Sequence, residues 1–146
     1  VEALERNKAV LCSTARELMS HDGRPLGKVI PVQSRITYKD LLKHNSIACS
    51  SVVVRRDVAR IFPMEHDDAH EDYILWLTIL KKGFFAKNTN TVEARYRVAE
   101  KSVSSNKGRA ASWTWNIYRK TLKFNVIKSA FCYSIYMVKG VLKYLK

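Results

Sequence analysis

The chain has 146 residues, of which 47% are hydrophobic, and this length and composition predict one folded domain and exclude wholesale disorder. Its formal net charge is +13, from 26 Lys and Arg against 13 Asp and Glu. Residues 101–146 hold ten basic residues and no acidic one, whereas residues 1–100 are nearly balanced. Such a tail predicts an anionic partner: nucleic acid, acidic lipid or a complementary protein face.

The spacing of the cysteines and histidines argues against disulfide bonds and against a metal-binding site. The three cysteines (Cys12, Cys49 and Cys132) are odd in number and lie far from one another, so neither a disulfide framework nor a zinc site is supported. A reducing compartment fits this pattern best. His66 and His70 are spaced to bind a metal on a helix, but no third ligand is specified, so exposed, metal-free histidines are favoured. No apolar run reaches the roughly 18–20 residues that span a bilayer.

Residues 1–8 carry an amphipathic helical pattern without an initiator Met, which leads us to expect a piece of a longer protein. Residues 9–19 are β-prone and predict a strand. The Asp22-Gly23 pair predicts a turn, after which the chain stays extended as far as Arg35.

Thr37 is a candidate N-cap for a short helix over residues 38–45, and Asp40 stands where it completes a capping box. Residues 47–56 follow as the best strand in the sequence. The three consecutive valines 52–54 predict burial on both faces, which suits a central strand of a covered sheet.

Residues 56–70 are expected to be irregular and acidic. Residues 71–83 predict a strong helix, with acids at its start and Gly83 at the position that ends it. Two short extended pieces around a polar turn are expected over 84–98, and a mobile polar loop over 100–112. Strands that alternate with helices predict an α/β fold.

From Trp113 onward the pattern is helical, aromatic and basic. In a helix over 128–146, four lysines fall within an arc of about 60°: Lys128, Lys139, Lys143 and Lys146. The broader remaining face is apolar, from Phe131 to Leu145. Two interpretations stay open: a helix lying in a membrane interface, or a helix packed on the rest of the chain with its lysines in solvent. No nucleic-acid-binding motif is present, so we expect no nucleic acid partner.

The acidic residues just before and at the start of the helix predicted over 71–83 are the densest negative charge in the chain: Glu65, Asp67, Asp68, Glu71 and Asp72. They could simply be solvated carboxylates that the helix dipole favours. Alternatively, one of them is a general base at the mouth of a cleft, with a pKa that the dipole holds low. Trp76 lies one turn after Asp72 on the same helix face, where it could stack on a sugar, although a core position is more common.

Four ordered segments carry a family resemblance: ITYKDLLKHNSIACSSVVVRR, HEDYILWLTILKKGF, ARYRV and KSVSSNKGRAASWTWNIYR. Together they resemble the C-terminal half of bacterial family 2 glycosyltransferases that build capsular, teichuronic or lipopolysaccharide-type glycans. The resemblance extends from about Val1 to Tyr144. It implies part of a GT-A fold, the nucleotide-diphospho-sugar transferase-like fold, without its N-terminal nucleotide-binding half and with a C-terminal basic helical tail.

The resemblance also implies an activity: transfer of a sugar from a nucleotide-sugar donor to a glycan or lipid-linked acceptor, with inversion. It maps Asp72 onto the catalytic base and Glu71 onto its acidic partner, and it places Trp76 on the acceptor side. Further positions fall near the donor sugar and acceptor (Asn45, Ser50, Ser51) or near the donor phosphates or a closing loop (Tyr96, Arg97). A polar strand edge for the serines and an ion pair for Arg97 are equally routine alternatives.

The chain lacks the family's Asp-x-Asp motif, since its Asp67-Asp68 pair follows the valine strand and lies in the wrong place. The divalent cation, Mg²⁺ or Mn²⁺, is therefore expected in the full-length enzyme but not on residues of this chain.

We expect an acceptor-side half-domain over 1–106 and a basic tail over 107–146 that holds the protein on the cytoplasmic face of the cell membrane. An exposed sheet edge makes a dimer possible. The alternative function is a non-catalytic basic module that binds anionic membrane or polymer.

Overall fold

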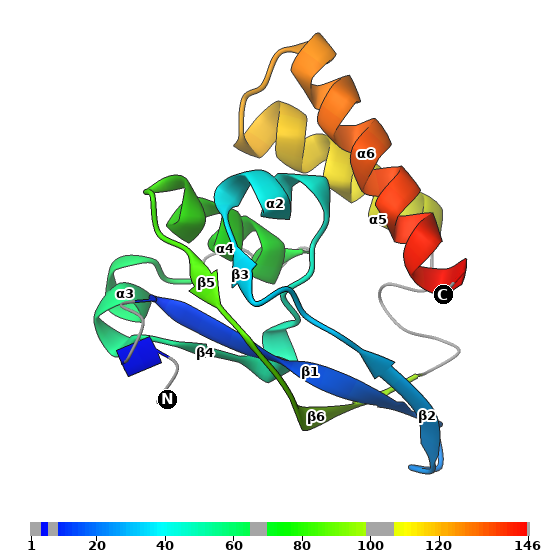
Figure 1. The fold of residues 1–146 in the computed structure, drawn as a ribbon. Coiled ribbons are helices and arrows are strands. Elements are labelled where there is room, and N and C mark those ends of the chain that lie inside the picture. The colour runs from blue at the N-terminus through cyan, green and yellow to red at the C-terminus, as the bar shows by residue number, and fades with distance from the viewer. Residues whose placement is uncertain (1–3, 6–8, 65–69, 99–106, 146) are drawn as a thin grey trace.

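The computed structural model describes residues 4–5, 9–64, 70–98 and 107–145, and it has a mixed α/β fold with a six-stranded sheet (Figure 1). The predicted α/β class is therefore confirmed. The helix expected over 1–8 falls largely outside the described residues, although Leu4 and Glu5 are helical.

Strand β1 (Leu11–Met19) organises the sheet, because it pairs with four other strands. Its first half lies antiparallel to β4 and meets β5, whereas its second half lies antiparallel to β2 and parallel to β6. Strand β3 extends the sheet through an antiparallel pair with β5. The other strands are β2 (Pro25–Ile30), β3 (Arg35–Ile36), β4 (Val52–Val54), β5 (Ala86–Lys87) and β6 (Thr89–Arg97).

The hairpin between β1 and β2 confirms the strand and turn that the sequence predicts. Ser20 donates its backbone N–H to the Arg24 carbonyl at 2.8 Å, and Gly23 takes a φ of 90°. A positive φ is available to glycine at little steric cost, which explains why Asp22-Gly23 predicts this turn correctly.

The strand that contains the three valines differs from the prediction. β4 has only three residues and pairs with β1 alone within the described residues, and Val53 is 48% exposed. The prediction of a central strand buried on both faces is therefore wrong for this chain. A 3₁₀ turn over Cys49–Ser51 precedes β4 and helix α3 (Arg56–Ile61) follows it, so the β-branched run has no room to extend. The same helix shows that the irregular segment expected over 56–70 is wrong for residues 56–61.

Two helices were predicted correctly from local signals. In α2 (Tyr38–Lys43), the Asp40 carboxylate accepts the Thr37 backbone N–H at 3.0 Å and the Thr37 hydroxyl at 2.6 Å, which closes the predicted capping box. Helix α4 spans Glu71–Lys81 with Lys82 as its C-cap residue, and Gly83 follows with a φ of 91°. Gly83 is the left-handed residue that commonly ends a helix.

Strands β5 and β6 occupy the expected extended segment, but Asn88 alone separates them, so the polar turn expected there is wrong. The buried Asn88 side chain accepts the Ser13 backbone N–H at 2.8 Å and the Ser13 hydroxyl at 2.9 Å, and it donates to the Gln33 carbonyl at 2.7 Å. These bonds hold the junction of β5 and β6 against β1. The chain can therefore pass from the pairing of β5 with β1 to the pairing of β6 with β1 without a turn.

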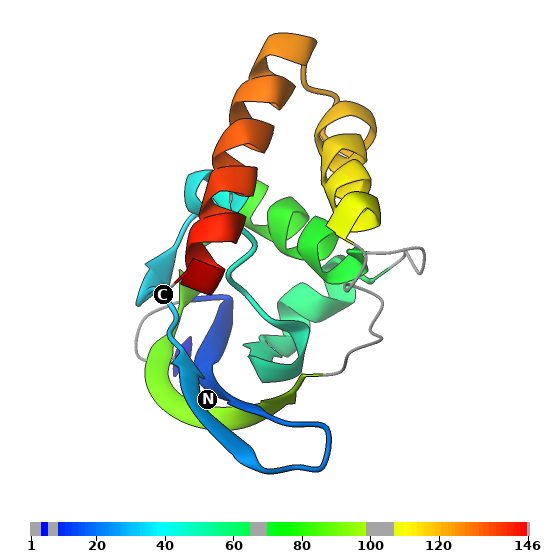
Figure 2. The same cartoon turned by 90° about the vertical axis from the view of Figure 1, so that its right-hand side faces the viewer.

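The C-terminal part is a helical hairpin. Helix α5 (Lys107–Asn116) runs into a π-helical turn (Ile117–Thr121), and α6 (Val126–Leu145) returns beside it (Figure 2). The helix predicted near the C-terminus is confirmed, whereas the loop expected over 100–112 is wrong from Lys107 onward. Figures 1 and 2 show α2 and α4 next to the sheet, with the hairpin beyond them.

One hydrophobic core joins the sheet, α2, α4 and the C-terminal hairpin. At its centre, Tyr73 of α4 donates its hydroxyl to the Leu41 carbonyl at 2.9 Å, and Tyr118 donates to the Leu42 carbonyl at 2.6 Å. The two hydroxyl oxygens lie 3.4 Å apart. The last carbonyls of a helix lack the regular intrahelical donor. Tyr118 supplies a donor to Leu42, and Tyr73 adds one to Leu41, which also accepts the His44 backbone N–H at 3.2 Å. The predicted boundary between residues 106 and 107 remains a prediction, although this core draws on both sides of it.

We predict that Tyr118→Phe lowers the free energy of unfolding by about 1–3 kcal/mol, because it leaves the buried Leu42 carbonyl without its donor. Tyr96→Phe removes the same group from an exposed position on β6 and should change stability by less than about 0.5 kcal/mol. Urea unfolding of both variants measures the difference. Equal effects from the two substitutions would contradict the role assigned to the buried hydroxyl.

Candidate functional site

The candidate site is the N-terminus of α4, where His70, Glu71 and Asp72 follow one another. His70 takes a left-handed φ of 57° and starts the helix. The Asp72 carboxylate accepts the N–H of the next residue, Tyr73, at 2.6 Å. Because Tyr73 is anchored in the core, this bond fixes the Asp72 carboxyl relative to the rest of the fold.

Burial raises the pKa of Asp72 above its ordinary value. The Tyr73 N–H opposes this rise, and the Glu71 carboxylate adds to it. The expectation that the helix dipole holds this pKa low is therefore wrong, since loss of hydration disfavours the charged form more strongly. A raised pKa makes Asp72 a better proton acceptor than an exposed aspartate.

The 3₁₀ turn over Cys49–Ser51 lies close enough to α4 to be influenced by its acids. The pKa of the Cys49 thiol is raised by partial burial first, and then by the Asp72 and Glu71 carboxylates. Ser50 is exposed in this turn, whereas Ser51 is buried and donates its hydroxyl to the Ala48 carbonyl at 3.2 Å. The fold therefore brings the predicted serines near the predicted base, with Ser50 accessible and Ser51 engaged in the turn.

Asn45 lies in the segment between α2 and this turn. Its side-chain oxygen is buried and has no hydrogen-bond partner among the described residues. An unpaired buried acceptor is uncommon in a folded protein and costs free energy. This is the one geometric feature that sets Asn45 apart from an ordinary loop residue, and its predicted place near a sugar stays a prediction.

Trp76 lies in the core with only 2% of its surface exposed. The ring packs in the core, and the predicted place of Trp76 on the acceptor side stays a prediction. The core position stated above as the alternative agrees with this burial. Trp76 lies one turn after Asp72, on the face of α4 that packs into the core.

Tyr96 and Arg97 lie at the end of β6, paired with the end of β1. Arg97 donates to the His21 carbonyl in the β1–β2 turn, and the Arg16 guanidinium lies 5.9 Å from the centre of the Tyr96 ring. These contacts of Tyr96 and Arg97 are with the β1–β2 hairpin, and a role at donor phosphates stays a prediction.

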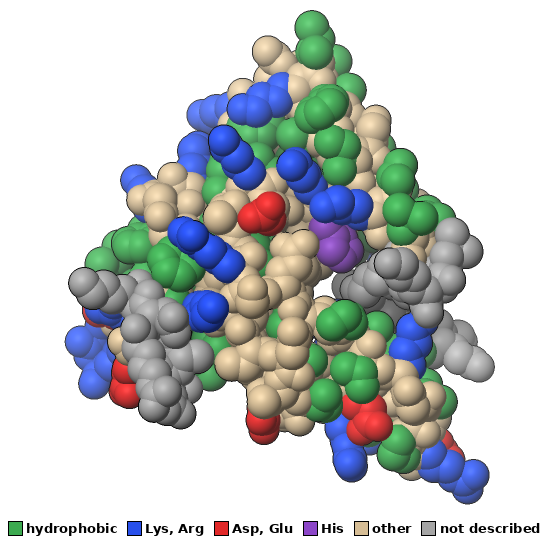
Figure 3. All heavy atoms as spheres, in the orientation of Figure 1, with side chains coloured by type: hydrophobic (Ala, Val, Ile, Leu, Met, Phe, Trp, Pro, Cys, Tyr) green, Lys and Arg blue, Asp and Glu red, His purple; other side chains and the backbone are tan. Residues whose placement is uncertain are grey.

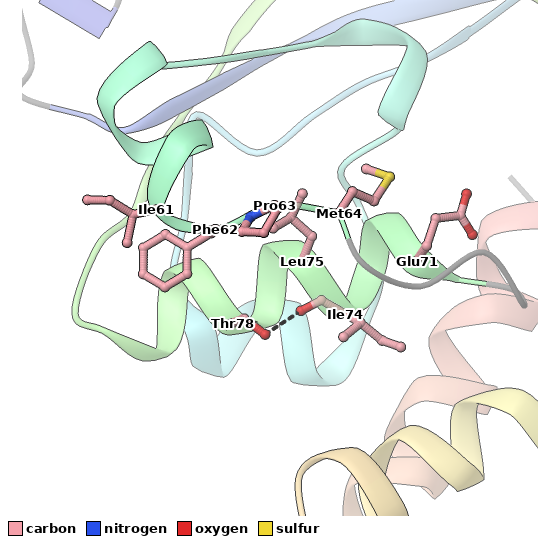
Figure 4. Close-up of a pocket in the computed structure, with 8 residues that line it drawn as sticks. All are labelled: Ile61, Phe62, Pro63, Met64, Glu71, Ile74, Leu75 and Thr78. Carbon is pink, nitrogen blue, oxygen red and sulfur yellow. Dashed lines mark hydrogen bonds between the residues drawn. The ribbon is translucent and has the colours of Figure 1, made fainter.

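A groove of about 160 Å³ runs between α4 and the end of α3, as Figure 4 shows. Glu71 lies at one end of it, and the Thr78 hydroxyl on its floor donates to the Ile74 carbonyl at 2.8 Å. The walls are mostly apolar: Ile61, Phe62, Pro63, Met64, Ile74 and Leu75. The groove therefore offers a largely apolar surface that leads to the acidic start of α4.

Trp113 is a neighbour of the site that sequence reasoning missed. The His70 ring meets the Trp113 ring edge-on, with centroids 5.5 Å apart and planes at 86°. The expectation that His70 is simply exposed is wrong, because the residue is half-buried and its Nε2 is enclosed. His66, its proposed partner, falls outside the described residues. No local spacing could reveal a contact between residues this far apart in sequence.

Metal ligation has no geometric support within the described ranges, which contain no group of three His, Cys, Asp or Glu able to hold an ion. Part of the acidic cluster (Glu65, Asp67 and Asp68) falls outside these ranges.

Comparison with known proteins finds no matching protein-family model. The chain is similar to a candidate teichuronic acid biosynthesis glycosyltransferase of Bacillus subtilis, TuaG, with 34% identity over 99% of the chain and 58% of that relative. It is also similar to two Escherichia coli proteins, WfaP (37% identity over 75% of the chain and 43% of the relative) and WfgD (34% over 82% and 46%). Both are named as UDP-Glc:α-D-GlcNAc-diphosphoundecaprenol β-1,3-glucosyltransferases. The chain spans about half the length of these curated relatives.

The raised pKa of Asp72 predicts a gain in stability on neutralisation. Because the folded-state pKa exceeds the unfolded one, the contribution of this group is present at low pH and is lost as pH rises through the folded pKa. Asp72→Asn should therefore increase the free energy of unfolding relative to wild type more at about pH 7 than at about pH 3. Denaturant unfolding at both pH values measures this difference.

Asp57→Asn is the matched control with the opposite sign. The Arg55 guanidinium beside Asp57 holds the pKa of that exposed carboxyl below its usual range, so its contribution is present above the unfolded pKa and is lost on acidification. The free energy of unfolding of this variant should therefore fall below that of wild type at neutral pH, and the difference should shrink in acid. If Asp72→Asn behaved like Asp57→Asn, the burial argument would be wrong.

Proposed function

Because the chain belongs to the bacterial glycosyltransferases, as a homologue of the C-terminal part of its relatives, we propose that the enzyme containing it transfers a sugar from a nucleotide-sugar donor to a glycan or lipid-linked acceptor. The transfer inverts the anomeric carbon and serves the synthesis of cell-surface polysaccharide. The mixed sheet with its helices is then the acceptor-side part of a GT-A fold.

The observation that carries this proposal is the Asp72 carboxyl, held by the Tyr73 N–H at the start of α4 with a pKa that burial raises. The acceptor hydroxyl attacks the anomeric carbon from the face opposite the leaving nucleoside diphosphate. As the new C–O bond forms and the old one breaks, Asp72 takes the hydroxyl proton. Glu71 assists because its charge helps to raise the pKa of Asp72.

We assign no part of donor binding to the described residues. A hard divalent cation commonly neutralises a leaving diphosphate, and we expect one in the full-length enzyme. The described residues do not fit such an ion, since they bring no three acidic, His or Cys side chains together. Every step assigned to this chain is therefore on the acceptor side.

The relatives suggest what kind of acceptor this is. WfaP and WfgD are named for an acceptor in which a sugar is linked through a diphosphate to undecaprenol, a membrane lipid. By analogy, we propose a lipid-linked acceptor for this enzyme and a working position at the cytoplasmic face of the cell membrane. No helix within the described ranges is long and apolar enough to cross a bilayer.

A second candidate function is a non-catalytic basic module that binds anionic membrane or polymer. The ten basic residues of 101–146, with no acid among them, favour it. It gives Asp72 no role, so the catalytic experiment below separates the two candidates.

We predict that Asp72→Asn in the full-length enzyme lowers kcat by about 10²- to 10⁴-fold, the usual contribution of a general base. Donor binding, measured by calorimetry, should stay within about twofold because the substitution leaves the donor side unchanged. Asp57→Asn on α3 is the control for loss of a carboxylate and should retain turnover. Wild-type turnover by the Asp72 variant would refute the assignment of the base.

A further inference from the structure

Helix α6 has two faces with different surroundings. Ser129 and Cys132 on the inner face are buried, and Tyr136 packs beside Tyr73 with ring centroids 5.8 Å apart. On the outer face, Ile127 is 82% exposed and Phe131 is 66% exposed. This helix is therefore packed on the fold and leaves large apolar side chains outside it at the same time.

The exposed residues form one stripe along the helix. Ile127, Phe131, Val138 and Leu142 follow one another at intervals of four, seven and four residues, which places them on a single helical face. With a rise of 1.5 Å per residue, the stripe is roughly 22 Å long. Val141 and the exposed Ser134 lie on the same face, and the two charged residues within this range, Lys128 and Lys139, lie beside the stripe. Single exposed apolar residues are ordinary, but a row of large ones along one face marks an interaction site.

Lysines flank this stripe on one side. On an α-helix, Lys128 and Lys139 fall roughly 100° and 120° around from Ile127, on the same side of the stripe, and both side chains are exposed. Figure 3 shows Lys and Arg side chains gathered over α2 and the adjoining edge of α6, with hydrophobic side chains along the outer edge of α6. Positive charge beside an exposed apolar stripe is complementary to the surface of a bilayer that contains anionic lipid.

We propose that the outer face of α6, defined by Ile127, Phe131, Val138 and Leu142, docks in the surface of an anionic membrane with the helix axis in the membrane plane. The inner face stays packed on α2 and α4. A second copy of the chain is a poorer occupant, because residues 101–146 of both copies are basic and would repel each other. The partner so identified is the membrane that holds a lipid-linked acceptor, and in that respect the inference rests on the proposed function.

Docking through α6 has a consequence for the candidate base. Tyr136 of α6 packs against Tyr73, and Tyr73 is the residue next to Asp72. A membrane contact on the outer face would therefore set the height and orientation of the α4 N-terminus above the lipid surface. An acceptor anchored in the same membrane would then meet Asp72 in a restricted geometry, which is the kind of positioning that accelerates a two-substrate reaction.

The test is sedimentation of the 146-residue chain with phosphatidylcholine vesicles, with and without phosphatidylglycerol. We expect binding only to the vesicles that contain phosphatidylglycerol. Ile127→Ser combined with Phe131→Ser should weaken this binding at least about tenfold, because the apolar area that the membrane buries is removed. Lys128→Glu combined with Lys139→Glu should weaken it similarly, and added salt should reduce it for the wild type.

The matched control is Leu26→Ser combined with Val53→Ser, which removes two exposed apolar side chains away from α6 and from the groove beside α4. It should bind as the wild type does. All substituted side chains are exposed, so circular dichroism and thermal unfolding should show unchanged folds. Unchanged binding by the Ile127/Phe131 variant would overturn the proposal, as would equal loss in the control.

Two further outcomes would also overturn the proposal. One is a dimer, detected by analytical ultracentrifugation, that only the Ile127/Phe131 variant loses, since the stripe would then receive a second copy. The other is vesicle binding by the isolated chain but not by the full-length enzyme, since another part of the enzyme would then cover α6. Vesicle binding is measured without donor or acceptor, so its result is independent of whether the enzyme transfers sugar through Asp72.

Discussion

The arrangement of the helices depends on how the C-terminal end of α2 is satisfied. The buried Leu42 carbonyl takes its donor from the Tyr118 hydroxyl, and the buried Leu41 carbonyl accepts the Tyr73 hydroxyl in addition to the His44 backbone N–H. These two tyrosines come from α4 and from the turn after α5, so one set of hydrogen bonds joins three segments. Burial raises the pKa of both hydroxyls, which keeps them protonated as donors at any ordinary pH. The position of Asp72, one residue before Tyr73, follows from this anchoring.

The anchoring also explains why Asp72 is costly for the fold. A carboxyl at a helix N-terminus is ordinarily favourable, yet this one is drawn toward the core by the residue that follows it, and it loses hydration that the Tyr73 N–H does not fully replace. The charged form of Asp72 is therefore less stable in this fold than the charged form of an exposed aspartate. Such a conflict between local stability and charge is common where a side chain is kept for chemistry.

Features set by neighbours in sequence could be predicted, whereas features set by distant partners could not. The capping box of Thr37 and Asp40 and the helix end at Gly83 depend on residues within one or two turns, and both were predicted correctly. Asn88 replaced an expected turn because its partners are Ser13 and Gln33, which no local pattern connects to it. The pKa of Asp72 was predicted with the wrong sign for the same reason: the dipole is local, whereas burial is tertiary. The family resemblance located the acidic pair, and the fold then showed that Trp76 belongs to the core.

The C-terminal helix shows why an amphipathic pattern alone could not choose between packing and membrane docking. Its apolar arc is wider than one contact needs, and the structure divides it: Cys132 and Tyr136 face the core, and Ile127 and Phe131 face outward. Burial of the inner part requires the tyrosine-anchored α2 and α4, so the outer part becomes a flat stripe only once the chain has folded. A membrane contact made through this stripe would be rigidly linked to α4. Acceptor access and membrane attachment would then be linked through the contact of Tyr136 on α6 with Tyr73 on α4.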